Sequence, residues 1–244
     1  MHEPIRGGGP SSAGGARKLA IQIGVTVSVV VIAVVLVLYL LISGREKLSA
    51  GNAVASPTAG QSESIRVSSD ALVTKPGSTE PKVVLSLYED LLCPHCARFE
   101  QAYGPTIDEL IASGTVAVDY YLIAILDSPR NQNYSSRAAA AAYCVADYSV
   151  EAFRGFHAAL LAAQPDEFAR DFPTDDDLAE TAEEAGAGGD VADCILSGRY
   201  VEMTKGLAAD TDVQSTPTVR INGEDYDLST PEDLVRKVTR LANR

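Results

Sequence analysis

Hydrophobic positions along the chain fall into two patterns. Residues 19–42, LAIQIGVTVSVVVIAVVLVLYLLI, form one apolar run without a formal charge. Because about 20 apolar residues cross a bilayer as a helix, this run predicts one N-terminal transmembrane helix. From about residue 65 onward, short apolar runs alternate with stretches whose apolar positions recur at helical spacing. That alternation predicts a folded α/β domain.

The first part of this domain predicts a strand, a helix and a second strand. Residues 82–88, KVVLSLY, form a short apolar run typical of a buried strand. Residues 97–112 have apolar positions at helical spacing, and Gly114 marks the end of that helix. Residues 115–126, TVAVDYYLIAIL, form the next strand. A helix between two strands predicts a βαβ crossover, which makes the strands parallel.

The middle of the domain predicts helices almost exclusively. It includes the run AAAAA, which strongly favours a helix because alanine has the highest helix propensity. The predicted helices span residues 135–148, 150–163, 174–185, 190–196 and 200–211.

The C-terminal part returns to strands and then ends in a helix. Residues 218–221 and 224–228 are strand-like, and Asn222–Gly223 between them is a strong hairpin signal. Pro231 suits the first position of the final helix. The predicted divisions are residues 65–130 and 212–244 for an α/β core, and 131–211 for an inserted all-α domain.

The apolar run of residues 19–42 predicts a membrane anchor with the domain on the outer side. Residues 1–18 carry more basic than acidic side chains, which favours a cytoplasmic tail. Residues 43–64 are rich in Ser, Ala and Gly, as a flexible linker is. A cleaved signal peptide is the alternative, but its apolar region usually has about 7–15 residues. The greater length of this run therefore favours a retained anchor.

Charge and cysteine content narrow the class of function. The chain has a net charge of −13 at pH 7, and an acidic domain repels nucleic acid and anionic lipid surfaces. Nucleic-acid binding is therefore excluded. The chain contains four cysteines, an even number, which suggests pairing if the domain lies outside the cytoplasm, where disulfides persist.

The motif Cys93-Pro94-His95-Cys96 follows the first strand and opens the first helix. A helix N-terminus stabilises a thiolate, Pro94 is tolerated in a first turn, and His95 adds positive character. Cys96, one turn on, can resolve a mixed disulfide. A metal clip is the first alternative, but zinc needs four ligands and a second such motif is absent. A structural staple is the second, although so small a loop adds little stability. The pattern favours a redox couple.

Two motifs give the domain a resemblance to a known family. YEDLLCPHCARF spans residues 88–99, and QSTPTVRING spans residues 214–223, with a helical insertion between them. From residue 65 to its end, the chain resembles the DsbA-like thiol:disulfide oxidoreductases of the thioredoxin superfamily. More narrowly, it resembles the membrane-anchored actinobacterial members, which carry a second cysteine pair in the helical part. The resemblance implies a thioredoxin-like core with an inserted all-α domain.

The resemblance also implies a role for each residue of the two motifs. Cys93 would be the attacking thiolate and Cys96 the buried resolving thiol. Pro94 and His95 would set the redox poise, and this dipeptide goes with an oxidising couple. Thr216–Pro217 would be a cis-proline loop that faces the cysteines, where an extended client peptide could add as a strand. An ordinary trans turn is the alternative reading of this loop.

One departure from the family concerns the proton of Cys96. Family members often have a buried acid six residues before the attacking cysteine, where this chain has Leu87. Glu89 and Asp90 lie nearby, close to the predicted strand end. Glu89 is the candidate proton relay, and a solvated surface charge is the alternative.

Three further side chains are candidates for a structural or chemical role. If Cys93 pairs with its neighbour, Cys144 and Cys194 remain, and we expect them to form a structural disulfide. Two buried thiols or a second redox couple are the alternatives. His157 follows Phe153 and Phe156 in a helical stretch, which favours a packing or surface role over a catalytic one.

These observations predict an anchored, extracytoplasmic protein disulfide oxidase. It would accept electrons from reduced exported proteins and be reoxidised by a membrane partner of the DsbB or vitamin K epoxide reductase type, which the resemblance alone implies. We expect a monomer without a cofactor or resident metal. A reductase of the same fold, such as one serving cytochrome maturation, is the nearest alternative. A thiol-based copper-binding module is the alternative from another class.

Overall fold

The computed structural model describes residues 64–244. The predicted tail of residues 1–18, the predicted transmembrane helix of 19–42 and all but the last residue of the 43–64 linker lie outside this part. Among the helices of residues 64–244, none has both the length and the apolar character needed to cross a membrane.

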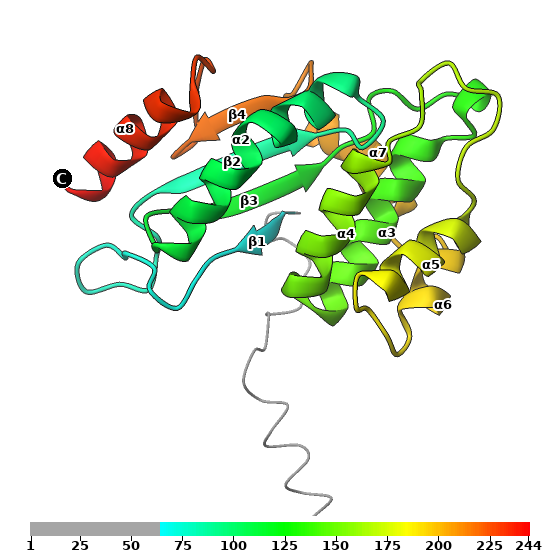
Figure 1. Cartoon of the computed structure of the whole chain (residues 1–244), viewed down its shortest axis with the longest axis horizontal. Helices are drawn as coiled ribbons and strands as arrows, with labels where there is room; N and C mark the ends of the chain where they lie inside the picture. Colours follow the sequence, from blue (N-terminus) through cyan, green and yellow to red (C-terminus); the bar gives the residue numbers. More distant parts are fainter. Residues whose placement is uncertain (1–63) are drawn as a thin grey trace, which may run out of the picture. The chain divides into compact units, whose positions relative to one another are not determined.

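A five-stranded mixed sheet forms the centre of the domain, with the strand order β1-β3-β2-β4-β5 (Figure 1). The central strand β2 (Val84–Glu89) pairs in parallel with β3 (Ala117–Leu122) and antiparallel with β4 (Thr218–Ile221). The edges are the short strands β1 (Ile65–Val67) and β5 (Glu224–Asp225), both antiparallel to their neighbours. The parallel pair confirms the predicted crossover.

Helix α2 (Pro94–Ala112) makes that crossover and lies across the sheet (Figure 1). Its apolar side chains, including Phe99 and Ile107, are buried in the core that the sheet also lines. Gly114 follows the helix with φ +72°, a left-handed conformation that favours glycine. The C-terminal helix α8 (Pro231–Ala242) begins with Thr230 as its cap, because the Thr230 hydroxyl accepts a hydrogen bond from the Asp233 amide.

The segment between β3 and β4 is helical and gathers beside the sheet (Figure 1). The alanine run at residues 138–142 is buried in α3. Because these side chains are small, neighbouring helices can approach α3 closely, and four of them contact it. The helices of this segment are α3 (Tyr134–Tyr148), α4 (Val150–Ala162), α5 (Asp175–Glu184), α6 (Val191–Leu196) and α7 (Val201–Asp210).

A disulfide fastens two of these helices. Cys144 on α3 is bonded to Cys194 on α6, with a sequence separation of 50 and a Cα–Cα distance of 5.8 Å. Both residues are buried in the apolar core. The bridge therefore joins distant parts of the helical segment at its interior.

Helix α2 begins at Pro94, where the sequence places the motif that opens it, because the fixed φ of proline suits the first helical position. Two predicted strands are longer than the observed ones. The strand predicted for residues 224–228 ends at Asp225. The strand predicted to reach Leu126 ends at Leu122. The backbone amide of Leu126 donates instead to the Asp90 carboxylate at 2.9 Å, so this part of the chain leaves the sheet.

The Cys144–Cys194 bridge predicts a large loss of stability on its removal. Closing a 50-residue loop restricts the unfolded chain by about 4 kcal/mol at room temperature. In a Cys93→Ser/Cys96→Ser background, we expect Cys144→Ala/Cys194→Ala to lower the free energy of unfolding by about 2–5 kcal/mol in urea denaturation. An unchanged urea midpoint and slope in the full chain would contradict this prediction.

Candidate active site

Cys93 and Cys96 lie at the start of α2, where the central strand β2 delivers the chain. Cys93 is the N-cap residue, in an extended conformation, and Cys96 lies in the first helical turn. Cys93 is 6% exposed to solvent, whereas Cys96 is fully buried at 0%. Both are free thiols in this structure. A partner thiol can therefore reach Cys93 far more readily than Cys96.

The Thr216–Pro217 loop faces the first of these sulfurs. The peptide bond between Thr216 and Pro217 is cis, and Cys93 Sγ donates to the Thr216 carbonyl at 3.5 Å. The loop leads directly into β4, which pairs with β2. The sheet thus brings two motifs together that lie more than a hundred residues apart in the sequence.

The environments of the two sulfurs shift their pKa values in opposite directions. Hydrogen bonding from the Cys96 side chain, then from Thr216 and the amides of Cys96 and His95, lowers the pKa of Cys93 to about 5, although burial opposes this. Burial first, then the Cys93 thiolate and the Glu89 charge, raises the pKa of Cys96 well above its ordinary value. Near neutral pH, the reduced pair is therefore one thiolate and one thiol.

The turn that carries Cys93 is held from two sides. The buried Asp90 carboxylate accepts hydrogen bonds from the amides of Leu92 and Leu126, both at 2.9 Å. The Gln164 side-chain amide donates to the carbonyls of Leu91 and Cys93, at 2.9 and 3.1 Å. Gln164 follows α4, so the helical segment fixes part of the redox centre.

Burial also changes the pKa of Asp90, which rises to about 6. The hydrogen bonds from the two amides lower it and the Cys93 thiolate raises it further, so burial remains the dominant cause. Asp90 is thus a second titratable group next to the Cys93 sulfur.

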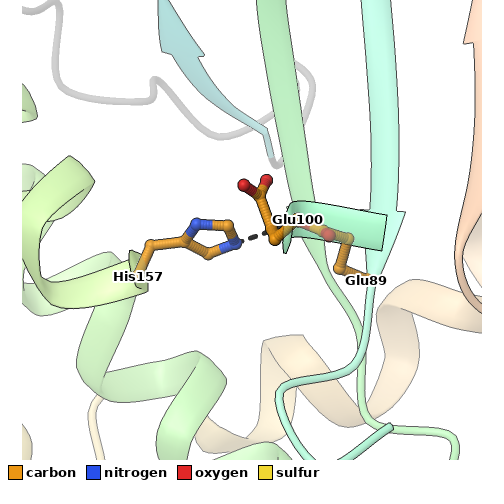
Figure 2. Close-up of side chains that lie close together, drawn as sticks. All are labelled: Glu89, Glu100 and His157. Atoms are coloured by element: carbon orange, nitrogen blue, oxygen red, sulfur yellow. Dashed lines mark hydrogen bonds and ion pairs between the residues drawn. The ribbon is translucent and has the colours of Figure 1, made fainter. Parts of the chain in front are cut away.

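Glu89 is a buried side chain, not the solvated one that the sequence allowed as an alternative. It is the last residue of β2, is 0% exposed, and its Oε2 lies 2.9 Å from His157 Nε2 (Figure 2). The other oxygen, Oε1, is buried without a hydrogen-bond partner. His157 lies on α4, packs edge-on against the Tyr120 ring and is itself buried.

Glu100 completes a cluster of three ionisable side chains. Its carboxylate comes from α2 and, with Glu89 and His157, places one ligand atom from each residue within 4.8 Å of the others (Figure 2). Burial, followed by the Glu89 charge, raises the pKa of Glu100 to about 7. Burial opposes a charge on His157, but the Glu89 and Glu100 carboxylates outweigh it and raise its pKa.

The remaining predicted site residues lie at the rim of the centre or away from it. Pro94 is half-buried at the first helical position, and His95 is exposed. The Arg98 guanidinium lies 3.0 Å from His95 Nδ1, and the His95 ring faces solvent beside it. Cys144 and Cys194, bonded to each other, take no part in the CxxC geometry.

The sequence did not point to Gln164 or Glu100, and for His157 it favoured a packing or surface role. His157 does pack against Phe153 and Tyr120, but its bond to Glu89 is a contact across 68 positions. No local sequence pattern predicts a contact between residues so far apart. The only available signal was a histidine among apolar residues of a helix, together with an acid at a strand end.

Within residues 64–244, Glu89, Glu100 and His157 are also the group whose geometry could hold a metal ion. Within that range, no group of three candidate ligands includes Cys93 or Cys96. The CxxC geometry therefore lacks the four-ligand set of a structural zinc clip.

Comparison with known proteins agrees with the geometry. A family model described as thioredoxin matches residues 73–239. The crystal structure of reduced DsbA from Mycobacterium tuberculosis is 54% identical, with a TM-score of 0.74, and the match covers 75% of this chain and 94% of that one. This chain belongs to the DsbA-like thiol-disulfide oxidoreductases of the thioredoxin family.

Two further relatives of this DsbA-like chain are more distant. MdbA from Corynebacterium diphtheriae, a thiol-disulfide oxidoreductase, is 23% identical with a TM-score of 0.57, covers 73% of this chain and 95% of its own, and shows the shared fold. The serine/threonine-protein kinase PknE of M. tuberculosis is 35% identical over 138 residues, which cover 55% of this chain. The match spans 24% of the length of that curated relative, so the two proteins share a part only.

The opposed pKa values of the DsbA-like pair predict an acidic titration of one thiol. In the reduced full chain, we expect the thiolate ultraviolet absorbance to appear with a midpoint near pH 5, because hydrogen bonds stabilise the Cys93 anion. Cys93→Ser should remove this transition, and Cys144→Ala/Cys194→Ala should retain it. A midpoint near the ordinary thiol value, about 8.5, would contradict the prediction.

Proposed function

We propose that this chain is an extracytoplasmic protein disulfide oxidoreductase that donates the Cys93–Cys96 disulfide to reduced client proteins. The observation that supports this most strongly is the contrast between the two sulfurs. Cys93 is the more accessible one and its pKa falls to about 5, whereas Cys96 is fully buried. A stabilised thiolate favours the reduced state of the pair, and a pair that is readily reduced is an oxidant toward other thiols.

Thiol–disulfide exchange with the client proceeds in two steps. A client thiolate attacks Cys93 Sγ, the Cys93–Cys96 bond breaks, and a mixed disulfide forms while Cys96 takes up a proton. A second client thiolate then attacks the client sulfur of the mixed disulfide and releases Cys93 as a thiolate. Two electrons pass from the client to the enzyme, the client gains one disulfide, and Cys96 keeps the proton.

Glu89 is the group that exchanges this proton. Cys96 has no exposure to solvent, so a group inside the protein must accept its proton when the pair is reoxidised. The Glu89 charge acts on the Cys96 thiol, and its Oε1 is free of other hydrogen bonds. The bond from His157 holds the carboxylate by its other oxygen.

The Thr216–Pro217 loop is the surface on which a client would bind. The Thr216 carbonyl contacts Cys93 Sγ, and the loop continues directly into β4 of the sheet. An extended client segment could pair with backbone groups there and bring its own cysteine to Cys93. Pro94 and His95, at the rim of the helix end, tune the redox potential of the pair.

The oxidase direction is favoured over that of a reductase by the stabilised Cys93 thiolate. A reductase of the same fold requires a disulfide that is harder to reduce, which an ordinary thiol pKa would favour. The copper-binding alternative is less favoured because it needs two thiolate ligands, and burial raises the pKa of Cys96 strongly.

The proposed location rests on the sequence. The apolar run of residues 19–42 would anchor a monomer in the membrane, with the tail of residues 1–18 in the cytoplasm. Reduced exported proteins would be the clients. The reduced enzyme would pass two electrons to a membrane reoxidant of the DsbB or vitamin K epoxide reductase type.

Client oxidation provides the direct test. The oxidised full chain should introduce disulfides into a reduced, unfolded protein. A client thiolate displaces Cys96 from Cys93, and a second client thiolate then releases Cys93. We expect Cys93→Ser to abolish the reaction. Incubated with a disulfide-bonded client, Cys96→Ser should accumulate mixed disulfides, because Cys93 opens the client disulfide and no resolving thiol follows; non-reducing electrophoresis resolves both outcomes. Equilibration with a glutathione buffer should give a potential well above that of thioredoxin, about −270 mV. A potential near or below that value would reassign the chain to the reductase direction.

Removal of the Glu89 carboxylate should slow reoxidation without preventing client binding. Proton transfer by a positioned group contributes about 10²-fold or more, so Glu89→Gln should reduce the single-turnover reoxidation rate by about that factor. The loss should diminish as pH rises, since hydroxide then removes the Cys96 proton. Glu109→Gln, which changes an exposed acid of α2, is the matched control. Equal rates for the two variants would remove Glu89 from the mechanism.

A further inference from the structure

The cluster of Glu89, Glu100 and His157 combines features that a single proton transfer does not require. Its three side chains come from β2, α2 and α4, and they converge with ligand atoms within 4.8 Å of one another (Figure 2). One imidazole nitrogen and two carboxylates form a donor set that zinc binds in proteins.

Unsatisfied oxygens provide the second, independent observation. Glu89 is fully buried, and its Oε1 has no hydrogen-bond partner. Glu100 Oε1 is likewise buried without one. Two neighbouring carboxylates repel when both are ionised, and an unpaired buried oxygen is costly. A divalent ion bound by the two carboxylates would offset both costs.

The dimensions permit such an ion after small side-chain movements. Bonds of about 2.1 Å to a tetrahedral centre place neighbouring ligand atoms about 3.4 Å apart. His157 Nε2 and Glu89 Oε2 are already 2.9 Å apart, and no atom of the set exceeds 4.8 Å from another. Glu100 is the partly exposed member, so an ion can enter from its side.

The surrounding charges are compatible with a cation. Arg154 on α4 is a positive group in this region, but its guanidinium pairs with Asp108 at 2.7 Å and Glu151 at 3.5 Å. Tyr120 on β3 contributes a neutral ring, because burial raises its pKa well above the ordinary value. Neither group therefore places an unpaired positive charge against the cluster.

We propose that Glu89, Glu100 and His157 form a zinc-binding site near Cys96, and that bound zinc slows disulfide exchange by occupying the carboxylate that exchanges protons with Cys96. The slowing effect rests on the proposed function, whereas zinc binding does not. Three protein ligands leave a fourth position for water. Zinc binds the deprotonated forms of its ligands, so its affinity should rise with pH.

Zinc binding is tested on the oxidised full chain, in which both cysteine pairs are disulfide-bonded and cannot ligate metal. Calorimetric titration with zinc alone should show one ion per chain. His157→Ala and Glu100→Gln should each weaken binding more than about tenfold, while His95→Ala, an exposed histidine, should not. Because Glu100 Oε1 has no hydrogen-bond partner that the substitution would remove, Glu100→Gln tests the site even if His157→Ala misfolds. Absence of binding, or binding unchanged by Glu100→Gln, overturns the site.

The effect on exchange is tested as the ratio of rates with and without zinc in each variant. Zinc that binds client thiols would slow every variant equally. Zinc bound at the cluster should slow the wild type and His95→Ala but not Glu100→Gln. Equal ratios in all variants overturn the inhibitory effect while the titration still decides the site. A wild type without activity in the absence of zinc would instead contradict the proposed function.

Discussion

The chemistry of this domain depends on unequal solvation of two sulfurs that are one helical turn apart. The parallel β2–β3 pair ends where α2 begins, so the chain must turn at Cys93 and immediately bury Cys96. Amide groups at the helix start favour an anion on the first sulfur, while the core disfavours one on the second. The same short segment thus holds an anion and a neutral thiol without needing a cofactor to separate them.

Local signals in the sequence were sufficient for most of the elements and for the placement of the cysteine pair at a helix start. The apolar run before Cys93, the helical spacing after it and the Asn222–Gly223 turn each depend on neighbouring residues, and each matches the structure. The family resemblance supplied the facing loop at Thr216–Pro217, which spacing alone left as an ordinary turn. The burial of Glu89 could not be predicted in the same way, because it depends on α4 covering the end of β2.

Long-range contacts set the limit of prediction for the rest of the site. Gln164 reaches the carbonyl of Leu91 across 73 positions, and His157 reaches Glu89 across 68. Glutamine and histidine in a helical stretch are usually surface or packing residues, so their residue type does not predict these long-range contacts. The early end of β3 has a similar origin, since the Asp90 side chain captures the Leu126 amide that a longer strand would have used.

The position of Gln164 ties the two parts of the fold together. The amide that steadies the Cys93 turn belongs to the helical segment, not to the thioredoxin-like core. An insertion without that glutamine and without His157 would leave the Cys93 turn and the buried Glu89 without these partners. The environment of the two sulfurs is therefore a joint property of core and insertion.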